Sequence, residues 1–140
     1  MDDVILNKSA IIERCITRVR EEYTHHEGEL ETHFTRQDSI ILNLQRACEA
    51  AIDLGTRLVA IHKLGVPQSS RDVFALLEKN GSITPSLSGS LQKMVGFRNV
   101  AVRTYDRLDL VIVRAIITER VDDLLTFAQH ARKIMSEPSI

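Results

Sequence analysis

Apolar residues recur every three or four positions along nearly the whole chain, which is the spacing of amphipathic α-helices. The pattern predicts a first helix over roughly residues 3–24. A long second helix follows, with Thr35-x-x-Asp38 resembling a capping box in which Asp replaces Glu. The apolar repeat ends near Leu64-Gly65, so the second helix is expected to end there.

Capping and stop signals divide the rest of the chain. Ser69 is suited to cap a short third helix, and Asn80-Gly81 is suited to stop it. Thr84-Pro85 combines a capping hydroxyl with proline at the first helical position, so it predicts the start of a fourth helix. The apolar repeat of this helix continues to a point near Tyr105.

Asp109 is a good cap for a fifth helix, which the apolar pattern continues to about residue 136. Four long helices and one short helix predict an all-α fold, an antiparallel helical bundle. The 140 residues are enough for one domain of ordinary size, so residues 1–140 are expected to form a single helical domain. Hydrophobic residues make up 44 % and aromatic residues only 4 %, so the core must be mainly aliphatic.

Charge and targeting signals exclude several classes of protein. The net charge of −1 excludes a strongly basic nucleic-acid coat. No apolar run approaches the ~20 residues that a membrane-spanning helix needs. The start, residues 1–4, shows no signal peptide. Cys15 and Cys48 have no partner at metal or redox spacing, so they are expected to be small buried residues of a reducing, cytoplasmic protein.

Two charged segments could be functional sites or simply solvent-exposed surface. The segment between the first two helices contains residues that could suggest a metal ion: His25, His26, His33, Glu27, Glu29 and Glu31. Their spacing matches no familiar ligand pattern, so a solvated acidic loop without a metal is favoured. For Arg14, Arg18 and Arg20 of the first helix, a solvated face is favoured.

The end of the predicted fourth helix, residues 96–105, is unusually polar for its neighbours. Arg98 and Tyr105 are seven positions apart, and the helical period places them about 20° apart around the axis. Arg98 is therefore expected to share a face with Met94, Ala101 and Tyr105, beside the core stripe.

An arginine beside a core stripe needs an anion or a carboxylate as partner. The structural interpretation is that Arg98 pairs with Glu49 or Asp53 of the second helix. The chain has 13 arginines and five lysines, and arginine is preferred where phosphate or carboxylate is bound bidentately. The spacing leaves both interpretations open.

Residues 98–105, here called the signature segment, resemble the signature of HEPN-domain toxins of the HepT type. That signature is Arg, usually Asn, three residues, His, any residue and Tyr. Residues 37–53 resemble the second helix of this family, and residues 64–72 resemble its connection into the third. The similarity covers nearly the whole chain, and three segments together are more specific than the short signature.

The resemblance implies a HEPN-like fold and the toxin of a type VII toxin–antitoxin pair. Toxins of this family are metal-independent ribonucleases that need no cofactor and act on RNA as homodimers, with two signatures facing each other. The implied antitoxin is a minimal nucleotidyltransferase, MntA, which neutralises the toxin by transferring AMP to the signature tyrosine. That residue is here Tyr105.

The resemblance implies Arg98, Asn99 and the position of Arg103 as catalytic residues. Metal-free cleavage needs a base near neutral pH, for which histidine is suited, and positive charge on the phosphorane. Arg103 stands where the family has histidine, and a guanidinium stays protonated and cannot act as the base. This chain is therefore expected to be inactive as written.

Two explanations of Arg103 remain open: an inactivating substitution, or a natural degenerate member that binds nucleotide, RNA or antitoxin. A third possibility is a purely structural helical protein. Pairing of Arg98 within one subunit would favour the structural possibility. Two Arg98 groups facing each other across a two-fold cleft would favour the others.

Overall fold

In a computed structural model, which describes residues 2–136, the chain folds into six α-helices joined by turns. The elements in chain order are α1 (Asp3–Tyr23), η1 (Glu27–Glu29), α2 (Phe34–Ile61), α3 (Ser70–Lys79), α4 (Pro85–Arg103), η2 (Tyr105–Arg107), α5 (Leu110–Glu119) and α6 (Val121–Ser136). Both η elements are single 3₁₀ turns. The predicted all-α class is confirmed.

The expected caps of three helices are confirmed. The side chains of Ser69 and Thr84 each accept a hydrogen bond at 3.1 Å from the backbone N–H three residues on. Asp109 accepts one from the N–H of Val111 at 2.9 Å. These bonds satisfy backbone donors that the first turn of a helix leaves unpaired, so they set the starts of α3, α4 and α5.

The capping box at Thr35 and Asp38 was a wrong prediction. The second helix begins two residues earlier, and His33 is its cap, since Nδ1 accepts a hydrogen bond from the N–H of Arg36 at 3.1 Å. Neutral imidazole has one nitrogen that can accept a hydrogen bond. Thr35 and Asp38 lie inside the helix.

The predicted fifth helix is two helices, because the chain turns at Arg120. Its N–H still bonds to the carbonyl of Ile116 at 2.8 Å, and its own carbonyl accepts from the N–H of Asp123 at 3.0 Å. The side chains of Arg120 and Asp123 both contact Ser90 of α4. With no glycine or proline at this position, the apolar repeat gives no sign of the break.

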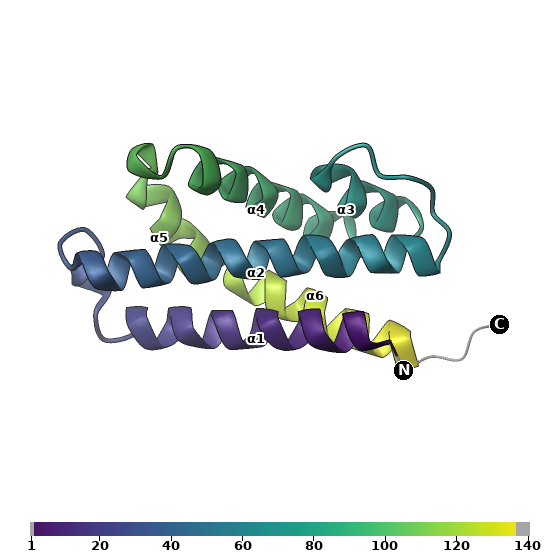
Figure 1. Cartoon of the computed structure of the whole chain (residues 1–140), viewed down its shortest axis with the longest axis horizontal. Helices are drawn as coiled ribbons and strands as arrows, with labels where there is room; N and C mark the ends of the chain where they lie inside the picture. Colours follow the sequence, from purple (N-terminus) through teal and green to yellow (C-terminus); the bar gives the residue numbers. More distant parts are fainter. Residues whose placement is uncertain (1, 137–140) are drawn as a thin grey trace.

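The long helices α1, α2 and α4 run in alternating directions, and α5 and α6 follow one another back along the molecule (Figure 1). The first two helices run antiparallel side by side, and α3 and α4 lie along the other side of α2. Helix α6 passes behind this layer and packs against α1, α2 and α4. The antiparallel arrangement expected from the sequence is therefore present.

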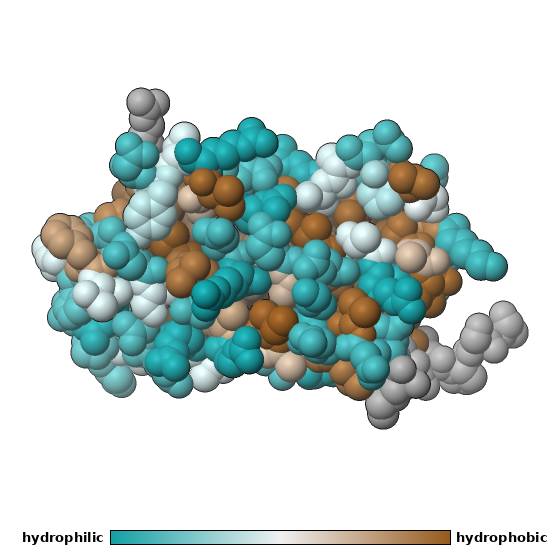
Figure 2. Space-filling model, viewed as in Figure 1, coloured by the Kyte–Doolittle hydropathy of each residue, from teal (hydrophilic) through white to brown (hydrophobic). Residues whose placement is uncertain are grey.

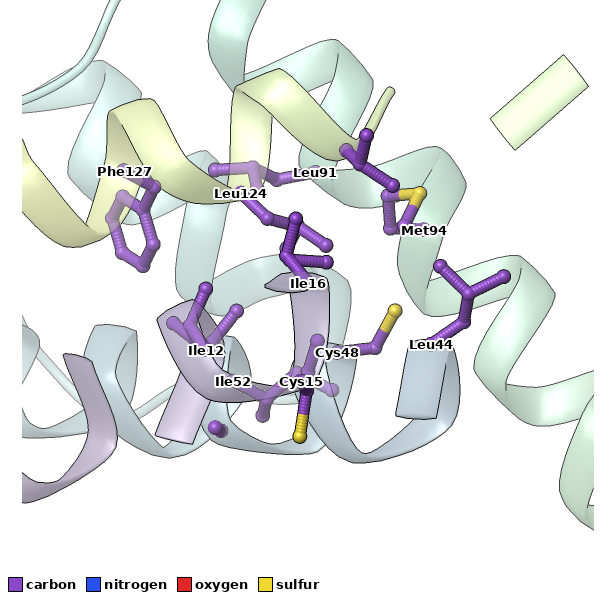
Figure 3. Packing of buried hydrophobic residues seen from close by; sticks show 14 of the residues in the cluster. Ile12, Cys15, Ile16, Leu44, Cys48, Ile52, Leu91, Met94, Leu124 and Phe127 are labelled. Atoms are coloured by element: carbon purple, nitrogen blue, oxygen red, sulfur yellow. The ribbon is translucent and has the colours of Figure 1, made fainter. Parts of the chain in front are cut away.

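The core forms where four helices meet, and Figure 3 shows their side chains converging. The residues labelled there are Ile12, Cys15 and Ile16 of α1, Leu44, Cys48 and Ile52 of α2, Leu91 and Met94 of α4, and Leu124 and Phe127 of α6. Both cysteines are buried and unpaired, as expected. Burial raises the pKa of the Cys48 thiol to about 12, so this thiol is protonated and unreactive near neutral pH.

The face shown in Figure 2 is mainly hydrophilic, with separate apolar side chains between the charged ones. Within residues 2–136, no helix has the length and apolarity required to cross a bilayer.

Candidate functional site

The signature segment occupies the last turns of α4 and the start of η2. Helix α4 ends at Arg103, and the cap residue Thr104 leaves the helical conformation with φ −138° and ψ 52°. The expectation that Arg98, Met94, Ala101 and Tyr105 share one face is therefore only partly correct. Met94 and Ala101 are buried beside Arg98, but the chain turns before Tyr105.

Arg98 joins three helices through its guanidinium. Its Nη1 donates to Oε1 of Glu49 in α2 at 2.6 Å, and its Nη2 donates to Oγ of Ser70 in α3 at 3.1 Å. This is the pairing within one subunit that the structural interpretation predicted. The alternative carboxylate, Asp53, instead binds Nζ of Lys8 at 3.0 Å.

The internal pair fixes Arg98 without using all of its hydrogen-bonding capacity. The Arg98 side chain is 18 % exposed to solvent. Its Nε is buried and has no hydrogen-bond partner in the described part of the chain. Glu49 neutralises part of the charge and holds the guanidinium in one orientation. Arg98 is thus a cation held in one orientation, mostly buried and only partly open to solvent.

The two other members of the predicted catalytic set lie closer to solvent. Asn99 is half-buried and Arg103 is exposed at the end of α4. Among the side chains that the structure describes, neither has a hydrogen-bond or ion-pair partner. Arg103 is therefore free to bind an anion from solution.

Tyr105 is 43 % exposed, so solvent reaches its side chain. Its hydroxyl donates a hydrogen bond to Oδ1 of Asp38, near the start of α2. Partial burial, this hydrogen bond and the negative charge of Asp38 raise the pKa of Tyr105 to about 12. The side chain is consequently a neutral phenol at physiological pH.

An apolar groove of about 470 Å³ runs between α4 and α5, next to the signature segment. Its apolar lining includes Phe97 and Val100 of α4 and Ile112 of α5, and Arg120 is one of its charged lining residues. The side chains of Ile112 and its neighbour Val111 are 52 % and 75 % exposed. The sequence pattern placed these residues in a helix but did not show that they would remain uncovered.

The acidic segment before α2 is surface-exposed, but its carboxylates bind residues of this chain. Glu31 pairs with Arg114 of α5, which also donates to the carbonyl of Glu27 at 2.7 Å. Glu29 contacts Nδ1 of His26 at 2.6 Å and Nη1 of Arg36 at 3.0 Å. The segment is therefore solvated, as expected, and its ion pairs also connect it to α2 and α5.

A search of residues 2–136 finds no group of three or more histidine, cysteine or carboxylate side chains placed to hold a metal ion. Of the arginines on the first helix, Arg14 and Arg18 are exposed as expected. Arg20, also exposed, forms an ion pair with Asp122 of α6.

Comparison with known proteins gives a clear family assignment. A family model described as ribonuclease HepT-like matches residues 12–131 of this chain. The chain belongs to the HepT-like ribonuclease family. The resemblance of the chain to this family is thereby confirmed.

Relatives of the chain cover almost its whole length. It is 47 % identical over 127 residues to the mRNA nuclease HepT of Shewanella oneidensis, covering 91 % of this chain and 95 % of that protein. A tri-AMPylated HEPN toxin of the same organism, in complex with an MNT antitoxin, superposes with a TM-score of 0.88 at 45 % identity, covering 95 % of this chain and 99 % of that chain.

A second solved structure, a toxin–antitoxin complex with AMP-PNP, gives a TM-score of 0.89 at 44 % identity and covers 94 % of this chain and 99 % of that chain. The TM-scores and the sequence identities, both over nearly the whole chain, agree that the chain has the fold of these HEPN toxins.

Proposed function

We propose that the chain is the toxin of a toxin–antitoxin pair, built on the scaffold of a metal-independent ribonuclease. The observation that carries this proposal is the signature segment itself, in which Glu49 and Ser70 hold Arg98 and in which Arg103 and Tyr105, further along the segment, are exposed. The segment lies in a chain of the HepT-like family whose Shewanella relative is an mRNA nuclease. The proposed substrate is RNA.

The residues of the signature segment are suited to bind an RNA phosphate. Arg98 is fixed by Glu49 and Ser70 and is 18 % exposed, and Arg103 is exposed with no partner among the side chains that the structure describes. Such guanidinium groups stabilise phosphate oxygens and the charge of a phosphorane. Asn99 lies between them in sequence and offers an amide donor.

Cleavage also requires a group that takes the proton of the ribose 2′-hydroxyl. Arg103 cannot do so near neutral pH, because a guanidinium remains protonated. The chain as written therefore binds RNA without efficient cleavage. An inactivating substitution and a natural RNA- or antitoxin-binding member both fit this account, and replacing Arg103 with histidine separates them.

We further propose that the toxin acts as a homodimer formed through the α4–α5 face. One signature segment offers too few side chains for acid–base chemistry. Two facing segments would supply twice as many. The groove beside Phe97 and the exposed side chains of Val111 and Ile112 support this choice of face. Exposed apolar patches of this kind are typical of interaction surfaces.

The proposed partner is a minimal nucleotidyltransferase antitoxin, which transfers AMP to Tyr105. The exposure of Tyr105 makes it accessible to another enzyme, and the related Shewanella toxin has been observed in an AMPylated state with its antitoxin. A nucleotide on Tyr105 would place bulk and negative charge beside Arg103. This would repel the RNA phosphate.

The test is to incubate the chain with ATP and a minimal nucleotidyltransferase antitoxin, such as the MNT antitoxin of the related Shewanella toxin, and to measure intact mass. Wild type should gain the mass of one or more AMP groups, and Tyr105→Phe should gain none. Tyr23→Phe is the matched control, because Tyr23 is the only other tyrosine of the chain. An unchanged mass of wild type, or an equal gain in Tyr105→Phe, would contradict the assignment.

A further inference from the structure

The phenol of Tyr105 is paired with a carboxylate from a distant part of the chain. Its hydroxyl donates to Oδ1 of Asp38, and the two residues are 67 positions apart in sequence. The contact joins η2, immediately after the signature segment, to the beginning of α2. It therefore exists only in the folded protein, at the atom to which the proposed antitoxin reaction adds a group.

The fold fixes both sides of this contact. On one side, Gln37 donates to the carbonyl of Leu30 at 2.9 Å, and Arg36 binds Glu29 at 3.0 Å and Glu22 at 3.6 Å, so the start of α2 is anchored. On the other side, the carbonyl of Tyr105 accepts from the N–H of Leu108 at 3.1 Å, which closes the η2 turn.

Asp38 differs from most carboxylates around it, because none of the basic side chains that the structure describes neutralises it. The neighbouring cation Arg36 is engaged by Glu22 and Glu29. Among the charged groups of the described residues, Asp38 is the one that acts on Tyr105. An uncompensated carboxylate is a better proton acceptor than one paired with arginine.

We propose that Asp38 is a catalytic residue for AMP transfer, which accepts the phenolic proton of Tyr105. This inference rests on the proposed function, in which Tyr105 is the AMP acceptor. In the transfer, the phenolic oxygen forms a bond to the α-phosphorus of ATP, and the bond from that phosphorus to the bridging oxygen breaks. Pyrophosphate leaves, and the proton passes to the carboxylate of Asp38 and then to water.

The need for a base follows from the state of the phenol. With its pKa raised to about 12, Tyr105 is protonated near neutral pH, and a neutral phenol is a weak nucleophile. Its acidity increases as the oxygen begins to bond to phosphorus, so a carboxylate already in contact can take the proton during that step. Such general-base assistance contributes roughly 10²–10⁴-fold to a rate.

The Asp38→Asn variant separates the role of Asp38 in proton transfer from its role in positioning the Tyr105 hydroxyl. Its amide oxygen can still accept the hydrogen bond from Tyr105, but it cannot take the proton. We expect Asp38→Asn to lower the rate of AMP incorporation by about 10²-fold or more at saturating toxin. The KM for the toxin should not change. Asp38→Glu, which retains a carboxylate, should recover much of the rate.

The experiment measures AMP incorporation by intact mass over time, with the same nucleotidyltransferase antitoxin, ATP and the full-length toxin. Asp106→Asn is the matched control, because Asp106 is an exposed carboxylate next to Tyr105 that makes no hydrogen bond in the described part of the chain. It should be modified at the wild-type rate. Circular dichroism and binding of the antitoxin should be the same for all variants.

The outcomes distinguish this inference from the proposed function. If wild type is modified on Tyr105 and Asp38→Asn is modified equally fast or faster, the role of Asp38 is overturned and the proposed function stands. If Asp38→Asn no longer binds the antitoxin, Asp38 is a docking residue and the inference is again overturned. If wild type gains no AMP, the proposed function and this inference fail together.

Discussion

The region built by α1, α2 and α6 differs from the end of the molecule built by the last turns of α4, η2 and α5. In the first region the apolar stripes are covered by the chain itself: Ile12, Ile16, Leu124 and Phe127 are all 0 % exposed. In the second, Val102 is 55 % exposed, Val111 75 % and Ile112 52 %.

The polar groups differ in the same way. Several arginines of the scaffold are paired with carboxylates of other helices, as Arg20 is with Asp122 and Arg132 with Glu13. In the signature segment Arg98 is paired, but Arg103 next to the exposed apolar face is not. Burial and pairing therefore specify the scaffold, whereas the second region keeps unpaired charge and uncovered apolar surface. Those are the properties of a surface that binds something else.

The largest effect should come from removing a ring in the scaffold. Phe127 is fully buried and meets Phe74 of α3 edge to face, with ring centroids 5.6 Å apart. Phe127→Ala should lower the free energy of unfolding by about 3–5 kcal/mol, because it leaves a cavity in the core. Phe34→Ala is the matched control, since Phe34 is 69 % exposed. Denaturant unfolding checks both, and equal losses would contradict the account of the core.

The same glycine substitution should have different effects in the two regions. At Gly55 of α2 an added Cβ would lie 2.6 Å from Cγ1 of Val73, within the packed core. At Gly96 of α4 it would lie 2.6 Å from Nη2 of Arg71, the end of a flexible side chain that can move away.

Gly55→Ala should therefore destabilise the protein by about 1–3 kcal/mol through overpacking. Gly96→Ala should leave stability unchanged or raise it by up to ~1 kcal/mol, because alanine favours the helix. Thermal unfolding of the two variants gives the comparison. A larger loss for Gly96→Ala would mean that Arg71 is fixed in place and that the signature end is as tightly packed as the scaffold.

A polar substitution on α5 should affect association rather than folding. Ile112→Ser should raise the dissociation constant of the proposed dimer by about tenfold or more, because each copy loses an apolar side chain worth ~1.5–3 kcal/mol when buried. Ile61→Ser is the matched control: Ile61 is 42 % exposed at the far end of α2. Light scattering over a concentration series checks this. If the wild-type protein is a monomer at every concentration, the proposed dimer is contradicted.

The scaffold could be predicted from the sequence because it follows local rules. Caps at Ser69, Thr84 and Asp109, and an apolar repeat of three and four, were sufficient for most helix boundaries. The break at Arg120 could not be predicted in this way, because it depends on contacts with Ser90 of α4 rather than on a helix-breaking residue.

The candidate site was predictable only in part. Spacing and family resemblance drew attention to Arg98, and Glu49 was one of two partners that the helical face allowed. The pairing of Tyr105 with Asp38 was missed because the chain turns at Thr104 and brings the phenol to α2. A turn of this kind has no signal in helical periodicity.

The central claim is that the second region is a ribonuclease site whose missing element is a base at position 103. Arg103→His supplies an imidazole that titrates near neutral pH, so it should raise cleavage of total RNA in the presence of EDTA by roughly 10²–10⁴-fold over the parent chain. Arg98→Ala added to this variant should abolish the gain by removing charge from the phosphate site. A folded, dimeric Arg103→His protein that leaves RNA intact would contradict the claim and assign the segment to binding alone.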